Sequence, residues 1–276
     1  MRTEIRYRDV LTRSARVRVG ELGSGRPIVL VHDLFGSHED FEPILEALAA
    51  KMHVILLDLP GFGESEKPRK YEYGFEGFAE TVLDALAALS LSRVTLLGHG
   101  FGGGVVLTLA ARHPSVAERL VLVGPAVYDL RPTFLLRLAR TPGLGRVLLK
   151  QWLGARGFGR LMPHSDFRAA RNKTEYSRFN SPDGREAAAL ALGACLDLRP
   201  VRAVVPRLST PTLVVWGDSD PLVSPHEGRR LARELTRGTL VVLGAGHWPH
   251  QELPGPFVEH VLDFLADEPE PSPNSR

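Results

Sequence analysis

Short apolar runs alternate along the chain with segments in which apolar residues recur at helical spacing. The runs predict strands at residues 27–31, 54–57, 94–97, 120–123, 213–216 and 240–243. Those at 27–31 and 54–57 are expected to be buried strands, since an unbroken apolar run is typical of a parallel strand buried on both faces. A looser alternation at residues 13–21 predicts an exposed antiparallel strand. Helical spacing covers residues 40–50, 75–90, 105–111, 226–235 and 256–266. Strands that alternate with helices predict an α/β fold with a mostly parallel, doubly wound sheet.

The alternation stops between residues 130 and 207, where glycine and proline interrupt helical stretches and no clear strand is visible. We therefore predict a core domain in two parts, residues 1–129 and 208–266, separated by an inserted segment at 130–207. Residues 267–276 are rich in proline and acidic side chains, a composition that favours a disordered tail.

Composition adds limits on function. The chain has 276 residues, 43% of them hydrophobic and 24% charged, enough for one large domain with a core. A net charge of +2 gives no argument for nucleic-acid binding. The single cysteine, Cys195, excludes an internal disulfide and a cysteine metal cluster, and we expect it to be a small buried residue on a helix. Residues 1–9 lack the apolar core of a signal peptide, and no apolar run reaches membrane-spanning length. We expect a soluble, cytoplasmic protein with no metal, cofactor, nucleic-acid or membrane partner.

One stretch carries a recognisable pattern of strand, sharp turn and helix. The apolar run at 94–97 leads into the sequence GHGFGGG at 98–104, and helical spacing resumes at 105. This could be an ordinary glycine-rich turn, for example one that binds phosphate. It resembles the nucleophile elbow Gly-x-Ser-x-Gly of the α/β-hydrolase family, with Gly100 at the serine position. Glycine tolerates the strained backbone of such an elbow but brings no nucleophilic oxygen.

Three further motifs extend the resemblance to the α/β-hydrolase family over residues 13–266. The sequence DLPGFGES at 58–65 is similar to a structural turn of the family. The loop WGDSDPLV at 216–223 matches the one that carries the acid of the catalytic triad, at Asp220, and GAGHWPH at 244–250 matches the histidine loop, at His247. The order elbow, acid, histidine is the one this family uses. The resemblance implies an eight-stranded sheet and a helical lid over residues 130–207.

Other residues compete for these roles. Asp218 could be the acid, although the family pattern favours Asp220. His250 could replace His247, although the Gly-x-Gly-His pattern favours His247 and leaves His250 as a supporting or surface residue. His99, inside the elbow, is expected to be a packed structural residue.

A second departure from the family lies on the oxyanion side. The family has His-Gly after its third strand, whereas this chain has His32-Asp33. The resemblance places the oxyanion-binding N–H groups at Leu34 and Phe101. An ionised Asp33 that points inward would oppose an oxyanion, because two unit charges ~4 Å apart repel by about 4 kcal/mol at an effective dielectric near 20. The alternative is that Asp33 turns outward and caps the helix near residues 34–40.

These departures argue against ordinary serine-hydrolase activity, because losing a triad nucleophile costs on the order of 10⁶ in rate. We predict an enzyme in which His247 and Asp220 act as an acid/base pair, with Asp33 as a second proton-transfer group. The space at Gly100 would admit water or a substrate group. Elimination, cyclisation, lyase-type chemistry and direct attack by water all fit. The alternatives are a non-catalytic ligand-binding protein and a serine hydrolase inactivated by glycine at position 100.

The inserted segment gives a hint about the substrate, which we expect to be a hydrophobic small molecule. Residues 130–172 contain eight arginines, one lysine and one acid, Asp166. Such a segment could receive an anionic or carrier-bound substrate, or it could be a solvated helical surface. Four aromatic residues could line a pocket or form the core of the lid: Phe134, Trp152, Phe158 and Phe167.

Overall fold

The computed structural model describes residues 4–128, 181–194 and 197–267. Most of the predicted lid therefore lies outside the described residues. So do the basic segment at 130–172 with its aromatic side chains, Cys195, and the predicted tail beyond residue 267. The expectations for those parts remain predictions.

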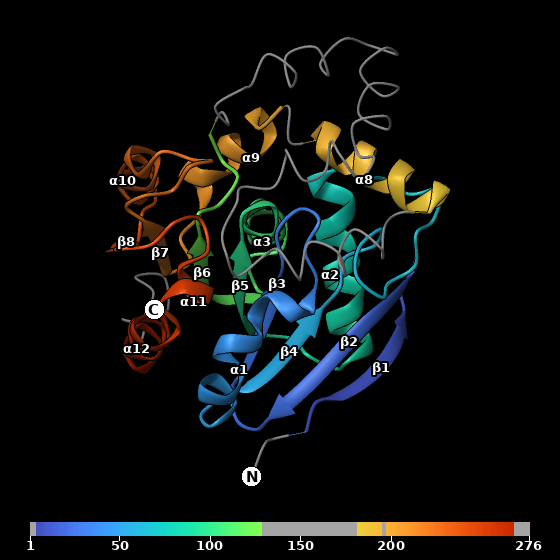
Figure 1. The fold of residues 1–276 in the computed structure, drawn as a ribbon, viewed down its shortest axis with the longest axis horizontal. Coiled ribbons are helices and arrows are strands. Elements are labelled where there is room, and N and C mark those ends of the chain that lie inside the picture. The colour runs from blue at the N-terminus through green and yellow to red at the C-terminus, as the bar shows by residue number, and fades with distance from the viewer. Residues whose placement is uncertain (1–3, 129–180, 195–196, 268–276) are drawn as a thin grey trace, which may run out of the picture.

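Eight strands form one sheet, in the order β1-β2-β4-β3-β5-β6-β7-β8 (Figure 1). The strands are β1 (Arg6–Leu11), β2 (Arg16–Gly23), β3 (Pro27–Val31), β4 (His53–Leu57), β5 (Val94–His99), β6 (Ala117–Val123), β7 (Thr212–Gly217) and β8 (Gly238–Leu243). β2 is antiparallel to both β1 and β4, and the other neighbours pair in parallel. The predicted eight-stranded, mostly parallel sheet is confirmed.

Helices connect the strands at the places where the sequence shows helical spacing. The main ones are α1 (Glu42–Ala49), α2 (Phe75–Ala88), α3 (Phe101–Arg112), α10 (Pro225–Glu234) and α12 (Pro254–Ala266). Shorter ones are η1 (His38–Phe41), η3 (Val205–Arg207) and α11 (Pro249–Glu252). Within the inserted segment, the described helices are α8 (Pro182–Ala194) and α9 (Arg199–Val204).

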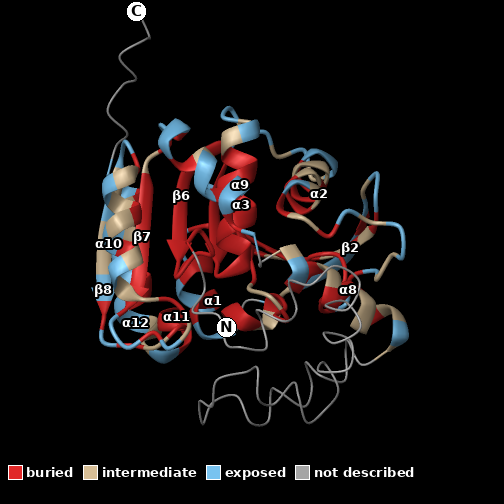
Figure 2. Ribbon diagram, turned by 90° about the horizontal axis from the view of Figure 1, so that it is seen from above, coloured by how far each residue is buried: buried red, intermediate tan, exposed pale blue. Residues whose placement is uncertain are grey.

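The core has two layers, one on each face of the sheet. Along β3, Val29 and Val31 face the layer that contains apolar residues of α2, α3 and α10. Ile28 and Leu30 face the opposite layer, with apolar residues of α1 and α12. Figure 2 shows that the central strands and α3 are buried almost throughout, whereas α10 and α12 expose their outer sides. Burial on both faces is the physical reason that these strands have unbroken apolar sequences.

Two elements, β1 and α11, were not predicted from the sequence. β1 lies at the edge of the sheet and buries only Val10, so its sequence RYRDVL has no apolar face that periodicity could detect. The strand predicted at 13–21 is β2, which is less exposed than expected because Val17, Val19 and Leu22 are buried. α11 spans only a single turn, which is too short for a periodic signal.

The loop after β4 is held together by a buried carboxylate. Asp58 is fully buried and accepts hydrogen bonds from the backbone N–H of His38 at 2.7 Å and of Glu64 at 2.8 Å. The Nδ1 atom of His38 lies 2.9 Å from the same carboxylate. Burial alone would raise the pKa of Asp58, but these partners outweigh it and the pKa lies below its ordinary value. The predicted turn at 58–65 is thus a structural feature.

We expect Asp58→Ala to lower the free energy of unfolding by about 3–5 kcal/mol, because it leaves buried donors without an acceptor. Urea denaturation near pH 7 measures this, with Asp58→Asn as the milder matched control. Since the folded pKa is lowered, the stabilisation is present above the ordinary pKa and is lost as pH falls through the folded value. Equal unfolding energies for Asp58→Ala and the wild type would contradict this role.

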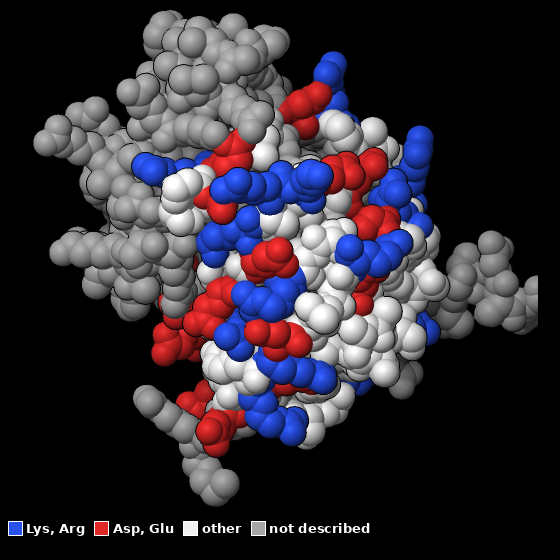
Figure 3. Space-filling model, turned by 90° about the vertical axis from the view of Figure 1, so that its right-hand side faces the viewer, with Lys and Arg blue, Asp and Glu red and all other residues white. Residues whose placement is uncertain are grey.

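The exposed side of the antiparallel strands carries charges of both signs (Figure 3). Arg16 and Arg18 both contact Asp9, at 2.8 and 3.3 Å, and Arg18 also contacts Glu64 at 2.9 Å. Such mixed pairs give a solvated face rather than a patch of one sign. Of the helices in the described parts of the chain, none combines the length and the apolar character needed to cross a membrane.

Candidate active site

The candidate residues converge where parallel strands end. Asp33 follows β3, Gly100 follows β5, Asp220 follows β7 and His247 follows β8. The carboxyl ends of parallel strands share one edge of the sheet, the usual position for ligand sites in open α/β folds. The structure thus joins segments that are up to 214 residues apart in sequence, counting from Asp33 to His247.

The elbow is formed as a sharp turn between β5 and α3. Gly100 has a φ of +51°, in the left-handed region, and directly precedes the first residue of α3. A side chain at Gly102 would meet the backbone carbonyl of His32 at 2.5 Å, so glycine is required for the close approach of strand and helix. The backbone therefore has the geometry of a nucleophile elbow, without the nucleophile.

His247 and Asp220 form a buried pair. The Nδ1 atom of His247 lies 2.7 Å from Asp220 Oδ2. The other oxygen of Asp220 accepts hydrogen bonds from the backbone N–H groups of Leu222 at 2.8 Å and Val223 at 2.9 Å, which fix the carboxylate. Asp218, the competing acid, is exposed and accepts a hydrogen bond from Ser219 instead. Asp220 is therefore the carboxylate that orients the His247 ring.

Asp33 points into this site. Its Oδ1 accepts a 2.6 Å hydrogen bond from the backbone N–H of Phe101, and its Oδ2 lies 3.5 Å from His247 Nε2. The alternative of an outward Asp33 that caps a helix is wrong, because Ser37 occupies the N-cap position of η1. The N–H of Phe101 was expected to bind a substrate oxyanion. In this structure it already donates its hydrogen bond to Asp33. Leu34, the other expected donor, packs its side chain against the core.

The expected open space at Gly100 is not there. A Cβ atom added at Gly100 would lie 2.8 Å from Asp33 Oδ2, and closer still to Cγ and Oδ1. The Asp33 carboxylate therefore occupies the volume into which a serine side chain would project. Asp33 and Gly100 are complementary replacements, because the carboxylate fits only where residue 100 has no side chain.

The two carboxylates change the protonation of His247. Burial alone would lower the pKa of His247, but hydrogen bonding to Asp220 and Asp33 and their negative charges raise it to about 9. Burial likewise raises the pKa of Asp33 and Asp220, but the contacts with His247 and backbone N–H groups outweigh it, and both values lie below the ordinary range. At neutral pH the site is therefore an imidazolium between two carboxylates.

Two further buried histidines pack next to this site. His99 is fully buried, and its Nε2 donates a 2.9 Å hydrogen bond to the backbone carbonyl of His247. Burial lowers its pKa to about 4, so it stays neutral. His250 is also fully buried, and its ring centre lies 4.6 Å from that of His99. The expectation that His250 could be a surface residue is therefore wrong. His99 is a packed residue, as expected.

Within the described parts of the chain, Asp33, His99 and His247 form a group that could hold a metal ion, with one ligand atom each and all three within 4.8 Å of one another. No sequence pattern indicated this group. The Nε2 atom of His247 faces Asp33, and the charge balance favours a proton at that atom. A cation would have to displace this proton.

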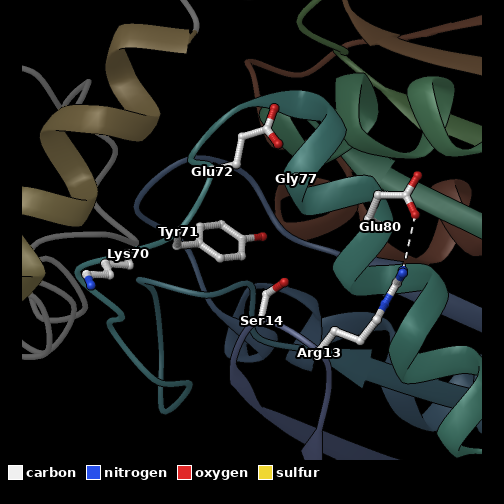
Figure 4. Close-up of a pocket in the computed structure, with 7 residues that line it drawn as sticks. All are labelled: Arg13, Ser14, Lys70, Tyr71, Glu72, Gly77 and Glu80. Atoms are coloured by element: carbon white, nitrogen blue, oxygen red, sulfur yellow. Dashed lines mark hydrogen bonds and ion pairs between the residues drawn. The ribbon is translucent and has the colours of Figure 1, made fainter.

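A surface hollow of about 450 Å³ lies elsewhere on the molecule (Figure 4). It is lined by Arg13, Ser14, Lys70, Tyr71, Glu72, Gly77 and Glu80. Arg13 and Glu80 pair across it at 3.4 Å, and the hydroxyl of Tyr71 is bonded to Thr81 Oγ1 at 2.9 Å. Since neither Asp33 nor His247 is among the lining residues, this hollow is separate from the candidate active site.

Comparison with known proteins agrees with the motifs. A family model described as the alpha/beta hydrolase fold matches residues 26–252. The chain belongs to this family. Among similar proteins, this α/β-hydrolase is 28% identical over 278 residues to a 2-hydroxymuconate semialdehyde hydrolase of Pseudomonas sp. (strain CF600), covering 94% of both chains. It is 27% identical to an uncharacterized hydrolase of Bacillus subtilis, YugF, covering 86% of this chain and 89% of the relative.

Solved structures show the same fold for this α/β-hydrolase. The enol-lactonase from Burkholderia xenovorans LB400 superposes with a TM-score of 0.74 at 26% identity, covering 94% of this chain and all of the other. A haloalkane dehalogenase from Bradyrhizobium elkani gives a TM-score of 0.79 at 20% identity, over 95% and 98% of the two chains. The second likeness concerns the fold alone. A relation to hydrolases makes an enzymatic role plausible for this chain.

Sequence reasoning also missed the filling of the nucleophile position by Asp33. A signal was present, because two departures from the family, at Asp33 and Gly100, occur together. A larger residue in one loop and a smaller one in the other are what a shared volume requires.

Proposed function

We propose that this α/β-hydrolase is an enzyme that works on a hydrophobic small molecule without a serine nucleophile. The observation that carries the proposal is the Asp33 carboxylate, which fills the serine position and faces His247 Nε2 at 3.5 Å. In this proposal His247, oriented by Asp220, transfers protons, and Asp33 is the second group in contact with the substrate.

The charge arrangement supports a proton-transfer cycle. With its pKa near 9, His247 holds a proton at neutral pH and can deliver it to a developing anion. Having given it up, the neutral imidazole can accept a proton from water or from substrate. Elimination, cyclisation, lyase-type reactions and direct attack by water all use such a cycle.

The substrate class is supported by relatives and by composition. A semialdehyde hydrolase and an enol-lactonase are among the similar proteins, which favours a small organic molecule. The basic segment at 130–172 favours a negative charge on the substrate or its carrier.

Two other functions remain as candidates with less support. In a serine hydrolase inactivated by glycine alone, the position beyond Gly100 would be empty, whereas here Asp33 fills it. In a ligand-binding protein, the buried Asp220–His247 pair would have no chemical role, although burying charges is costly. Both observations favour an enzyme.

A fluorophosphonate probe tests the absence of a serine nucleophile. We expect no labelling of the native chain, because no hydroxyl occupies the elbow position. A serine esterase of the same fold serves as the positive control. Stoichiometric labelling, for example at Ser37 in the neighbouring loop, would show that a serine works in this site and would overturn the proposal.

A further inference from the structure

His99 carries a buried nitrogen without a hydrogen-bond partner. The side chain is fully buried at the end of β5, and its Nε2 donates to the backbone carbonyl of His247 at 2.9 Å. A neutral imidazole has one N–H, so with the proton on Nε2 the Nδ1 atom presents a lone pair. Among the described residues, no group forms a hydrogen bond with this Nδ1. A buried polar atom in this state is costly unless a ligand binds it.

Two further ligand atoms lie close to His99. One carboxylate oxygen of Asp33 and one ring nitrogen each of His99 and His247 all lie within 4.8 Å of one another. Asp220 holds Nδ1 of His247, and a carbonyl holds Nε2 of His99, so the nitrogens left for a shared ion are His247 Nε2 and His99 Nδ1. Two imidazole nitrogens and one carboxylate oxygen are a ligand set that zinc prefers.

The separation of Asp33 Oδ2 and His247 Nε2 fits two ligands of one ion. The two atoms are 3.5 Å apart, which is longer than the usual hydrogen bond of about 2.7–3.2 Å. With ligand bonds of about 2.0–2.2 Å and tetrahedral angles, two ligands of one zinc ion lie about 3.3–3.6 Å apart. The pair already has the separation that a shared ion requires.

Each of the three side chains is held by another contact at an atom that the ion does not need. Asp220 holds Nδ1 of His247 at 2.7 Å, and the N–H of Phe101 holds Oδ1 of Asp33 at 2.6 Å. The carbonyl of His247 accepts from Nε2 of His99. Metal-binding histidines usually donate their other N–H to a carboxylate or a carbonyl, and metal-binding carboxylates are usually hydrogen-bonded as well. The surroundings of this group are therefore those of a metal centre.

The charges of the site balance for a divalent ion. Asp33 and Asp220 each contribute one negative charge, and two neutral histidines contribute none, so an ion of charge +2 brings the sum to zero. The proton that His247 holds in the metal-free chain offsets only one of the two. The Asp33 side chain is 18% exposed and that of His247 is 3% exposed, so an ion enters past Asp33. A water molecule can complete its coordination there.

We propose that Asp33 Oδ2, His99 Nδ1 and His247 Nε2 bind one divalent transition-metal ion, with Zn²⁺ as the best match. The ion replaces the proton on His247, so the ion-bound chain and the proton-transferring chain are alternative states of one site. His247 cannot act as acid and base while it is a ligand, and Zn²⁺ is therefore expected to inhibit the proposed reaction. The inference concerns binding, and it does not depend on the proposed function.

Cobalt(II) is the probe, because it accepts the geometry of zinc and has visible absorption bands that zinc lacks. The full chain without a histidine tag is dialysed against a chelator and titrated with Co²⁺. We expect the intense bands of a four-coordinate ion to saturate at one ion per chain and to disappear when Zn²⁺ is added. Mg²⁺ should not displace the cobalt, because it requires octahedral oxygen ligands.

Variants show which residues bind the ion. Asp33→Asn and His99→Leu should each raise the dissociation constant for Zn²⁺ at least about 10²-fold, the upper end of what the loss of an outer-shell partner costs. Asp220→Asn removes such a partner and should raise it about 10–100-fold. Asp218→Asn and His260→Gln, which change an exposed acid and an exposed histidine, should bind Zn²⁺ as the wild type does. Competition with a coloured chelator measures each constant.

Thermal melting of the metal-free variants shows which of them fold, and Asp33→Asn decides the matter if His99→Leu does not. Saturable four-coordinate bands that are lost in Asp33→Asn support the inference. Absence of these bands in the wild type overturns it, and so do bands of wild-type strength in Asp33→Asn, since the ion then binds elsewhere. None of these results changes the fluorophosphonate experiment, which tests the serine-free function separately.

Discussion

The paired substitution Asp33→Gly with Gly100→Ser is expected to create serine esterase activity that neither single substitution gives. A serine at position 100 needs the volume that the Asp33 carboxylate occupies. Removing that carboxylate also frees the N–H of Phe101 for an oxyanion and His247 Nε2 for the serine hydroxyl. A triad nucleophile is worth on the order of 10⁶ in rate, and a rebuilt one should recover a part of this, about 10²–10³-fold.

Hydrolysis of p-nitrophenyl acetate measures the gain, and the two single variants are the controls. Gly100→Ala adds a steric control, because it places the same Cβ beside Asp33 without a hydroxyl. Thermal melting shows which variants fold. If Gly100→Ser alone matched the double variant, Asp33 would not be occupying the nucleophile position, and the chain would be a serine hydrolase inactivated at one residue.

Replacing His247 with glutamine is expected to lower turnover by about 10³–10⁴-fold, the usual contribution of a group that serves as both acid and base. Glutamine fills a similar volume but neither accepts nor releases a proton at neutral pH. The measurement is kcat on the best substrate from a screen of lactones and vinylogous semialdehydes.

His260 provides the matched control, since it is an exposed histidine on α12. His260→Gln should retain wild-type kcat. A His247→Gln variant with wild-type kcat would contradict the enzymatic proposal and would favour the ligand-binding alternative.

The fold could be predicted because the burial of each strand leaves a pattern within that strand's own sequence. β3 and β5 are buried on both faces, and that burial requires unbroken apolar runs, which are visible in the chain. β1 could not be found in this way, because it covers the sheet edge with a single buried residue, Val10.

The site could be predicted only in part. Asp220 and His247 each follow a predicted strand in a recognisable loop, so their meeting at the sheet edge follows from the topology. The direction of Asp33 does not follow, because a side chain beside a strand end can turn either way. What decides it is the space left by Gly100, which lies 67 residues further along the chain. Sequence patterns describe single elements, and this constraint exists only between two of them.

The pairing of Asp33 with His247 is the central claim, and nitrogen NMR of the histidine side chains tests it most directly. The titration of His247 should show a pKa of about 9 in the wild type. In Asp33→Asn the pKa should fall toward the ordinary histidine value of about 6.5, because one of the two carboxylates that favour the imidazolium is gone. A wild-type pKa near the ordinary value, or one that Asp33→Asn leaves unchanged, would contradict the account.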